Sequence, residues 1–197
     1  GYYCPNDQHC APQVKGKITH FAHRKAMAID GLGEELVSRF VEEKLVSDYA
    51  DLYDLKQIQL ESLARFGKKS AEKLIQSIET SKQVPYERVL FALGIRHVGE
   101  NVAEKLCQKF PDIQTLQAAT LEELSNTRDV GEKIAGSIVQ FFQNPDNLKR
   151  IQRLQAAGLQ FRYVPTESQQ PVSDKLNGKT FLISGTFPVS REELQAM

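Results

Sequence analysis

The sequence lacks the features that mark several common protein classes. It contains no tryptophan, and no apolar run approaches the roughly 18 residues that a membrane-spanning helix needs. No signal peptide opens the chain. Its three cysteines are an odd number at uneven spacing, which argues against a disulfide framework and favours a reducing compartment. We therefore expect a cytoplasmic protein with no membrane partner.

The sequence also lacks a net charge, because 25 lysines and arginines balance 25 aspartates and glutamates. Most nucleic-acid-binding domains are basic, so a bulk electrostatic attraction to phosphate is missing here. Any binding to nucleic acid must instead use directed hydrogen-bond donors and local clusters of charge. Hydrophobic residues make up 41% of the chain, which is enough for a packed core.

What the sequence does contain is an internal repeat. Four segments share an apolar residue, then a glycine, then a helix-like pattern, and their glycines stand at positions 33, 67, 99 and 131. The steps between them are 34, 32 and 32 residues, a period that chance rarely keeps. Apolar residues follow each glycine at helical spacing, as in Ala71, Leu74, Ile75 and Ile78.

Further short helices are expected before the glycines, over residues 48–55, 57–64, 86–93, 112–118 and 121–126. Pro145 should open a last helix that runs to about Ala157 and ends at Gly158. The predicted fold is thus mainly α, a tandem helix-hairpin-helix domain of four repeats over residues 29–163. Residues 164–177 are polar with two prolines and are expected to be a linker.

A glycine before a helix suits a phosphate for two reasons. It can adopt a positive φ, so that the chain turns sharply, and it lets an anion approach the backbone closely. The first helical turn leaves N–H groups unpaired at the positive end of the helix dipole. Such contacts carry no sequence information, so binding should depend on DNA structure and not on base sequence. The candidate DNA-binding residues are Gly31, Gly33, Gly67, Lys68, Lys69, Arg96, Gly99 and Gly131.

The alternative is that these glycines end turns between packed helices, as in modules that bind only protein. Charge does not decide between the two interpretations. Lys68 and Lys69 suit a phosphate, whereas Glu34, Glu100 and Glu132 favour the helix dipole but repel an anion. We therefore expect unequal hairpins, with the second electrostatically the most favourable.

The cysteines and the other motifs offer little chemistry. Cys4 and Cys10 make up half of a zinc site, which usually needs four ligands, and two ordinary thiols are the alternative. Cys107 is expected to be a small buried hydrophobic residue on a helix. No catalytic constellation stands out. Residues 179–184 are a strand candidate, and the roughly 20 residues from position 178 to the end cannot bury a core of their own.

Particular runs resemble bacterial NAD-dependent DNA ligases. The pattern His20-Phe21, Arg24, Ala26-Met27 and Gly31-Leu32-Gly33 is specific to that family. Residues 3–13, with Cys4 and Cys10, are similar to the second half of its four-cysteine zinc finger. Residues 90–99 are similar to its third hairpin region, and residues 176–185 to the opening strand of its BRCT domain.

The resemblance implies a division of the chain. Residues 1–28 would be the second half of a zinc finger with a connector, and residues 178–197 the start of a truncated α/β BRCT domain. Cys4 and Cys10 would be two of the four zinc ligands, so that this chain holds zinc weakly or not at all. NAD and Mg²⁺ would belong to a missing catalytic region, because Ala28 occupies the lysine position of the family's Lys-x-Asp-Gly motif before Asp30-Gly31.

The function implied by the resemblance is to clamp nicked double-stranded DNA in replication and repair, as a monomer at the bacterial nucleoid and inactive in ligation alone. Two alternatives remain open. One is a non-enzymatic helix-hairpin-helix module of a repair or recombination complex, and the other is a protein-interaction scaffold, which the zero net charge favours.

Overall fold

A computed structural model describes residues 10–64 and 66–165 of the chain, and the regular secondary structure of these residues is helical. Their one isolated β-bridge joins Asp112 to Arg162. None of the helices in these ranges is long and apolar enough to cross a membrane. The elements are α1 (Ala11–Ala22), α2 (Glu34–Glu42), the 3-10 helix η1 (Tyr49–Asp54), α3 (Gln57–Glu61), α4 (Lys68–Ser81), α5 (Tyr86–Ala92), α6 (Glu100–Lys109), α7 (Ile113–Ala118), α8 (Leu121–Ser125), α9 (Glu132–Gln143) and α10 (Pro145–Ala156).

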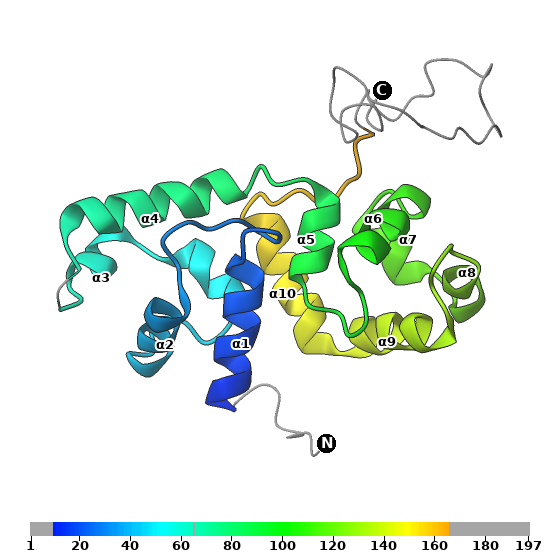
Figure 1. Cartoon of the computed structure of the whole chain (residues 1–197), viewed down its shortest axis with the longest axis horizontal. Coiled ribbons are helices and arrows are strands. Elements are labelled where there is room, and N and C mark those ends of the chain that lie inside the picture. The colour runs from blue at the N-terminus through cyan, green and yellow to red at the C-terminus, as the bar shows by residue number, and fades with distance from the viewer. Residues whose placement is uncertain (1–9, 65, 166–197) are drawn as a thin grey trace, which may run out of the picture. The chain divides into compact units, whose positions relative to one another are not determined.

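The helices pack in consecutive pairs, with α1 against α2, α3 against α4, α5 against α6 and α8 against α9 (Figure 1). Each pair is joined by a turn that contains one of the regularly spaced glycines. The fourth residue after each glycine is completely buried, and its small or branched side chain lets the two helices approach closely; these residues are Val37, Ala71, Ala103 and Ala135.

One core runs through these helices, and α1 contributes much of it. Ile18 and Phe21 of α1 are fully buried, and the Phe21 ring stacks on Tyr49 with 4.6 Å between ring centroids. This helix is not predicted from the sequence, because its polar residues and Gly16 interrupt the apolar pattern. Residues 11–22 therefore belong to the same packed unit as the hairpins that follow.

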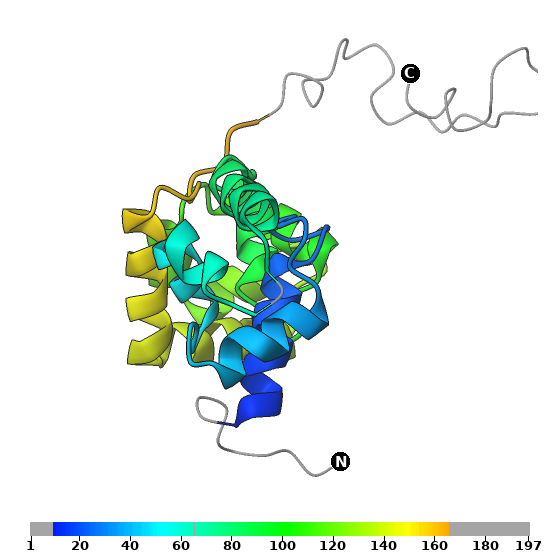
Figure 2. The ribbon, with the colours of Figure 1, turned by 90° about the vertical axis from the view of Figure 1, so that its left-hand side faces the viewer.

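An ionic cluster ties the end of this unit to its beginning. The Arg153 guanidinium donates to Asp51 at 2.8 Å and also contacts Asp54, and Arg150 Nε donates to Asp48 at 3.3 Å. These pairs join α10 to η1 across about a hundred positions of sequence, and Figure 2 shows the two elements side by side. They hold the last helix against the first helices of the chain.

The mainly helical fold predicted from the sequence is confirmed for the described residues. The expected short helices over 48–55, 57–64, 86–93, 112–118 and 121–126 correspond to η1, α3, α5, α7 and α8, each shorter by one to three residues. The helix from Pro145 is α10, and Gly158 follows it with a φ of 95°. Cys4, the linker from residue 166, the strand candidate and the rest of the predicted BRCT segment lie outside the described residues.

Candidate nucleic-acid interface

The turns that carry the four glycines share one hydrogen-bond pattern. In each, the residue before the glycine donates its N–H to the carbonyl three positions earlier. The pairs are Leu32 to Ile29 at 3.4 Å, Phe66 to Leu63 at 3.0 Å, Val98 to Ile95 at 3.0 Å and Val130 to Thr127 at 3.0 Å. Three of the four donors and all four acceptors belong to buried residues, so the turns are anchored from below by side chains in the core.

In the first, third and fourth turns, the sharp bend lies before the helix-capping glycine and not at it. The backbone takes a positive φ two positions earlier, at Gly31 (85°), His97 (67°) and Asp129 (64°). Our expectation that the capping glycine itself turns with a positive φ is therefore wrong. The left-handed conformation tolerates glycine best but is also visited by Asp and His, so two hairpins manage the bend without glycine.

The capping glycines have ordinary extended backbones. Their φ values are −80° at Gly33, −77° at Gly67, −88° at Gly99 and −81° at Gly131. All four are exposed, and a Cβ added to any of them would meet no atom within 4 Å. Neither backbone conformation nor internal packing requires glycine at these positions, so the fold does not explain why all four lack a side chain.

These glycines also leave their helices without a cap. No side chain caps the N-terminus of α2, α4, α6 or α9. Other helices of the chain are capped by Asp48, Asp112, Thr120 and Asn144, whose side chains accept from backbone N–H groups at their helix starts. Because a helix cannot pair its own first N–H groups, the four hairpin helices present donors to the surface.

Cationic side chains stand beside three of these helix starts. Lys68 and Lys69 are the exposed first two residues of α4, and Arg96 is exposed in the turn before α6. The Lys133 ammonium follows Gly131 and is close enough to His97 to influence it: slight desolvation and the charges of Lys133 and Arg96 hold the His97 pKa below its usual range. The third and fourth turns are therefore near neighbours.

Two further ion pairs bear on these turns. Lys25 Nζ lies 2.9 Å from Glu100 Oε1, so the acid at the start of α6 is neutralised by a lysine from the loop after α1. Lys105 of α6 pairs with Asp129, which links the third helix pair to the fourth turn. Lys25 and Lys133 were not among the DNA-binding residues predicted from the sequence. Lys133 could have been predicted, because it stands two positions after the capping glycine of its turn, as Lys69 does.

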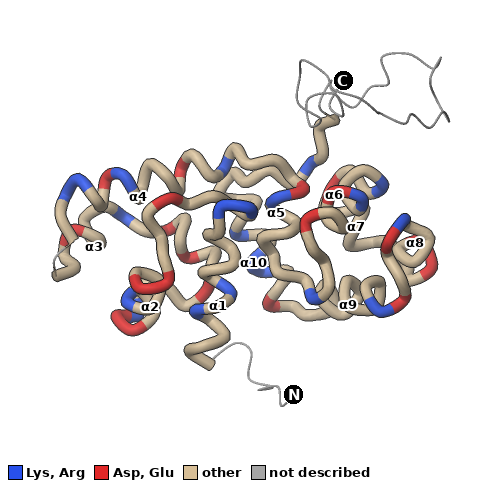
Figure 3. The backbone as a smooth tube through the Cα atoms, viewed as in Figure 1, with Lys and Arg blue, Asp and Glu red and all other residues tan. Residues whose placement is uncertain are grey.

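The structure does not gather all the candidate residues into one place. The second turn, with Gly67 and Lys68, lies at the opposite end of the helical unit from α8 and α9 (Figure 1). Along the chain trace, basic and acidic residues are interspersed (Figure 3). The candidate interface is thus a set of separate helix N-termini, each with unpaired backbone N–H groups and some with nearby charged side chains. The zero net charge led us to expect such local sites.

The cysteines stand apart from these turns. Cys10 is half-buried just before α1, and Cys4 lies outside the described residues. Within residues 10–64 and 66–165, no three or more His, Cys, Asp or Glu side chains converge as metal ligands do. Cys107 is completely buried and burial raises the pKa of its thiol, as expected of a hydrophobic core residue.

Two family models match the chain. The model described as "SAM-like Helix-hairpin-helix tandem" matches residues 24–80, which include the first and second turns. The model described as "Helix-hairpin-helix motif" matches residues 88–151, which include the third and fourth. The chain therefore contains tandem helix-hairpin-helix motifs.

Curated relatives named "DNA ligase" match nearly the whole chain. The protein from Bacteroides fragilis is 52% identical over 94% of this chain, that from Phocaeicola vulgatus 50% identical over all of it, and that from Cytophaga hutchinsonii 47% identical over 98%. The chain spans 28 to 30% of the length of these relatives.

Proposed function

We propose that this chain is the region of a DNA ligase that holds nicked double-stranded DNA through contacts to the sugar–phosphate backbone. Its likeness to curated ligases over nearly its whole length supports a ligase parent, and its tandem helix-hairpin-helix motifs support DNA binding. The catalytic steps would be performed by residues outside this chain, so the chain alone should bind nicked DNA and not seal it.

A single observation carries the proposal: the four capping glycines are exposed, uncapped and not required by the fold. A side chain at these positions would cover the first N–H groups of the helix. Its absence leaves a surface on which a phosphate oxygen can reach those donors and the positive end of the helix dipole. We infer that all four turns are hairpins of the helix-hairpin-helix type.

Backbone contacts of this kind place the protein on the duplex without reading bases. Gly31, Gly33, Gly67, Gly99 and Gly131 would supply the close approach, and Lys68, Lys69 and Arg96 the charge. Lys133 joins this set because it lies beside the third and fourth turns. Sequence-independent binding suits an enzyme that must act at nicks in any sequence, in replication or in repair.

The parent enzyme would use NAD to activate the nick and Mg²⁺ to assist phosphoryl transfer, and both would bind outside this chain. Zinc is proposed for Cys4 and Cys10 together with two ligands from elsewhere. Because Cys10 is the one described residue of that set, the proposal rests on the resemblance to ligase zinc fingers. Metal analysis of the purified chain should give well below one zinc per molecule, and a full, tightly held equivalent would contradict this.

The glycines give the direct test of the function. We would replace Gly99 and Gly131 by alanine, one at a time, and measure binding to a nicked duplex by fluorescence anisotropy. The added methyl group enters open space in the free protein, so circular dichroism should show an unchanged fold. Affinity should fall about tenfold, because losing one charge-assisted contact to an anion costs about 1.4 kcal/mol.

Gly136→Ala is the matched control. Gly136 lies inside α9, five residues after Gly131, and a Cβ there also meets nothing within 4 Å. This variant should bind nicked DNA as the parent chain does. If Gly99→Ala and Gly131→Ala bind equally well, or if binding does not weaken with added salt, the turns are not phosphate seats and a protein-interaction scaffold becomes the better explanation.

A further inference from the structure

A cavity of about 290 Å³ lies between α1, η1, the segment that ends α5, and α9 with α10, and none of the four capping glycines lines it. A second cavity of about 420 Å³ adjoins it. The two are lined in common by Lys17, Tyr49, Leu93 and Gly94. Together they form a continuous hollow, which we call the α1–α10 cavity.

Three basic side chains line the polar part of this cavity, and one of them, Arg150, is ion-paired with Asp48 at 3.3 Å. Lys17 comes from α1, Arg96 from the turn before α6, and Arg150 from α10, so three separate elements contribute one cation each. No aspartate or glutamate is among the residues that line either hollow, although the chain has as many acidic as basic residues.

Arg150 is held in position before any ligand arrives. Its Nε donates to Asp48 at 3.3 Å and its Nη1 donates to the Asn147 side chain at 2.9 Å. The guanidinium has five N–H donors, so these contacts fix its plane and leave further donors available. A pre-positioned arginine binds an oxyanion with little loss of side-chain entropy.

Tyr49 supplies a second, independent feature. Its side chain is 4% exposed, its ring is fixed by stacking on Phe21, and it lines both hollows. Burial raises the pKa of the Tyr49 hydroxyl, so the group keeps its proton and can act as a hydrogen-bond donor.

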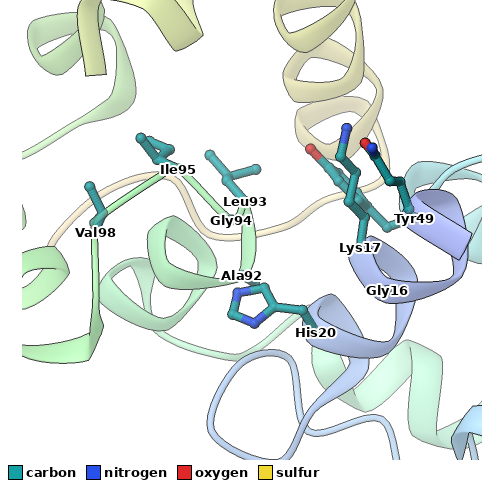
Figure 4. Close-up of a pocket in the computed structure, with 10 residues that line it drawn as sticks. Gly16, Lys17, His20, Tyr49, Ala92, Leu93, Gly94, Ile95 and Val98 are labelled. Atoms are coloured by element: carbon teal, nitrogen blue, oxygen red, sulfur yellow. The ribbon is translucent and has the colours of Figure 1, made fainter. Parts of the chain in front are cut away.

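The directions of the side chains agree with a shared ligand. Figure 4 shows Lys17 and Tyr49 extending side by side toward α10, while Leu93 and Ile95 lie across the hollow. The cationic end of the hollow is therefore continuous with an apolar end formed by Leu93, Ile95 and Val98.

We propose that the α1–α10 cavity binds an oxyanion of the phosphate class, with Lys17, Arg96 and Arg150 around the anion and the Tyr49 hydroxyl donating to it. The anion has two possible sources, a free phosphate or nucleotide and a phosphate of bound DNA. The proposal does not depend on the capping glycines, because none of Gly33, Gly67, Gly99 or Gly131 lines the hollow.

The test uses inorganic phosphate as the probe, with the chain labelled for ¹H–¹⁵N NMR and ionic strength held constant with chloride. Saturable shifts are expected at the amides of Gly16 and Gly94, which line the hollow. Tyr49→Phe keeps the stacked ring and removes one neutral hydrogen bond, so the Kd should rise about fivefold. Lys17→Gln removes a charge and should raise the Kd at least about tenfold.

Lys73→Gln is the control, because Lys73 is exposed on α4 and lines neither hollow. Its phosphate affinity should equal that of the parent chain. Shifts that grow linearly without saturation, or that are the same in Tyr49→Phe and Lys17→Gln as in the parent, would overturn the proposal.

A second arm identifies the source of the anion. If saturating nicked duplex abolishes the phosphate-induced shifts, the cavity receives a phosphate of DNA. If duplex and phosphate bind together, the cavity receives a free phosphate or nucleotide. Both results support an oxyanion site, whereas the loss of duplex binding in Gly99→Ala with intact phosphate shifts would separate this site from the hairpins.

Discussion

Gly31 and Gly33 stand two positions apart in the first turn and are glycine for different reasons. Gly31 has a φ of 85°, a conformation that costs a residue with a side chain about 1–2 kcal/mol. Gly33 has an extended backbone and open space where a Cβ would be. The first glycine serves the fold, and we propose that the second serves a ligand.

The same substitution should therefore lower stability at Gly31 but not at Gly33. Gly31→Ser should lower the free energy of unfolding by about 1 kcal/mol through backbone strain. Gly33→Ser should leave it unchanged or raise it by a few tenths of a kcal/mol, because serine is a good helix cap. Urea denaturation of both variants measures the difference, and a comparable loss of stability in each would contradict the assignment.

At the fourth turn, one substitution should raise the stability of the fold and weaken DNA binding. Gly131→Asp places a carboxylate on the free N–H groups of α9, which stabilises the helix by about 0.5–1 kcal/mol and also repels phosphate. We expect a higher melting temperature together with at least about tenfold weaker binding to nicked duplex.

Gly131→Asn is the uncharged counterpart of this variant. It should stabilise α9 similarly, since Asn caps as well as Asp, and it should weaken binding less. If Gly131→Asp is destabilised, or if it binds as tightly as the parent chain, then the start of α9 is not the seat that we propose.

Single residues of the turns show which features could be predicted from the sequence. The period of the glycines and the helix after each were readable because small residues and apolar spacing are local signals. The position of the positive φ was not, because His97 and Asp129 adopt it without a compositional cue. Glycine is permissive, so its presence does not state which property of glycine is being used.

At the scale of elements, the contact between α10 and η1 is fixed by ions. Asp51 accepts from the Ser47 backbone at 2.6 Å and hydroxyl at 2.7 Å, and from Arg153 at 2.8 Å. Burial alone would raise the Asp51 pKa, but these hydrogen bonds outweigh it and hold the pKa below its usual range. The ionised carboxylate is therefore favoured in the folded chain.

This direction sets a dependence of stability on pH. Because the folded pKa is below the unfolded one, the stabilisation by Asp51 is complete above the ordinary pKa of about 3.8 and is lost as the pH falls through the lower, folded value. Asp51→Asn should cost about 1–2 kcal/mol at pH 7 by removing the charge-assisted bonds.

Urea denaturation of the parent chain and of Asp51→Asn at pH 7 and at pH 3 measures this contribution. The gap between the two proteins should narrow on acidification. If the difference in the free energy of unfolding is the same at both pH values, Asp51 stabilises the fold through packing and not through its charge. Glu122→Gln, an exposed acid on α8 with no role in this cluster, is the control and should change stability little at either pH.

No sequence pattern predicted the ionic cluster between α10 and η1 or the buried helix α1. Arg153 and Asp51 are separated by 102 positions, and a surface charge on a helix has many possible partners before the chain is folded. Likewise, Ile18 and Phe21 are buried by contacts with Tyr49 and the helices around it. The sequence around them has no strong amphipathic repeat that would predict this burial. Local propensity predicts elements, whereas their packing depends on contacts that are distant in sequence.

At the scale of the whole molecule, electrical balance and DNA binding are compatible because the proposed contacts are directed. Amide donors at helix starts attract phosphate without adding net charge. The acid at the start of α6 is neutralised by Lys25, which removes one repulsion that the sequence alone suggested. The cations near the turns, Lys68, Lys69, Arg96 and Lys133, are few, so few counterions should be released on binding.

The salt dependence of binding can be predicted from this number. Each neutralised duplex phosphate contributes about −0.9 to the slope of log K against log salt, so about four contacts give a slope of about −3.5. Lys69→Gln should make the slope shallower by about 1 and weaken binding to all sequences equally, because the contact is to backbone. Lys149→Gln, on α10 and outside the turns, should leave the slope unchanged.

A slope near −10 would require many more cations than the turns provide and would place the DNA on another surface. A slope near zero would mean that the chain does not bind the phosphates of the duplex.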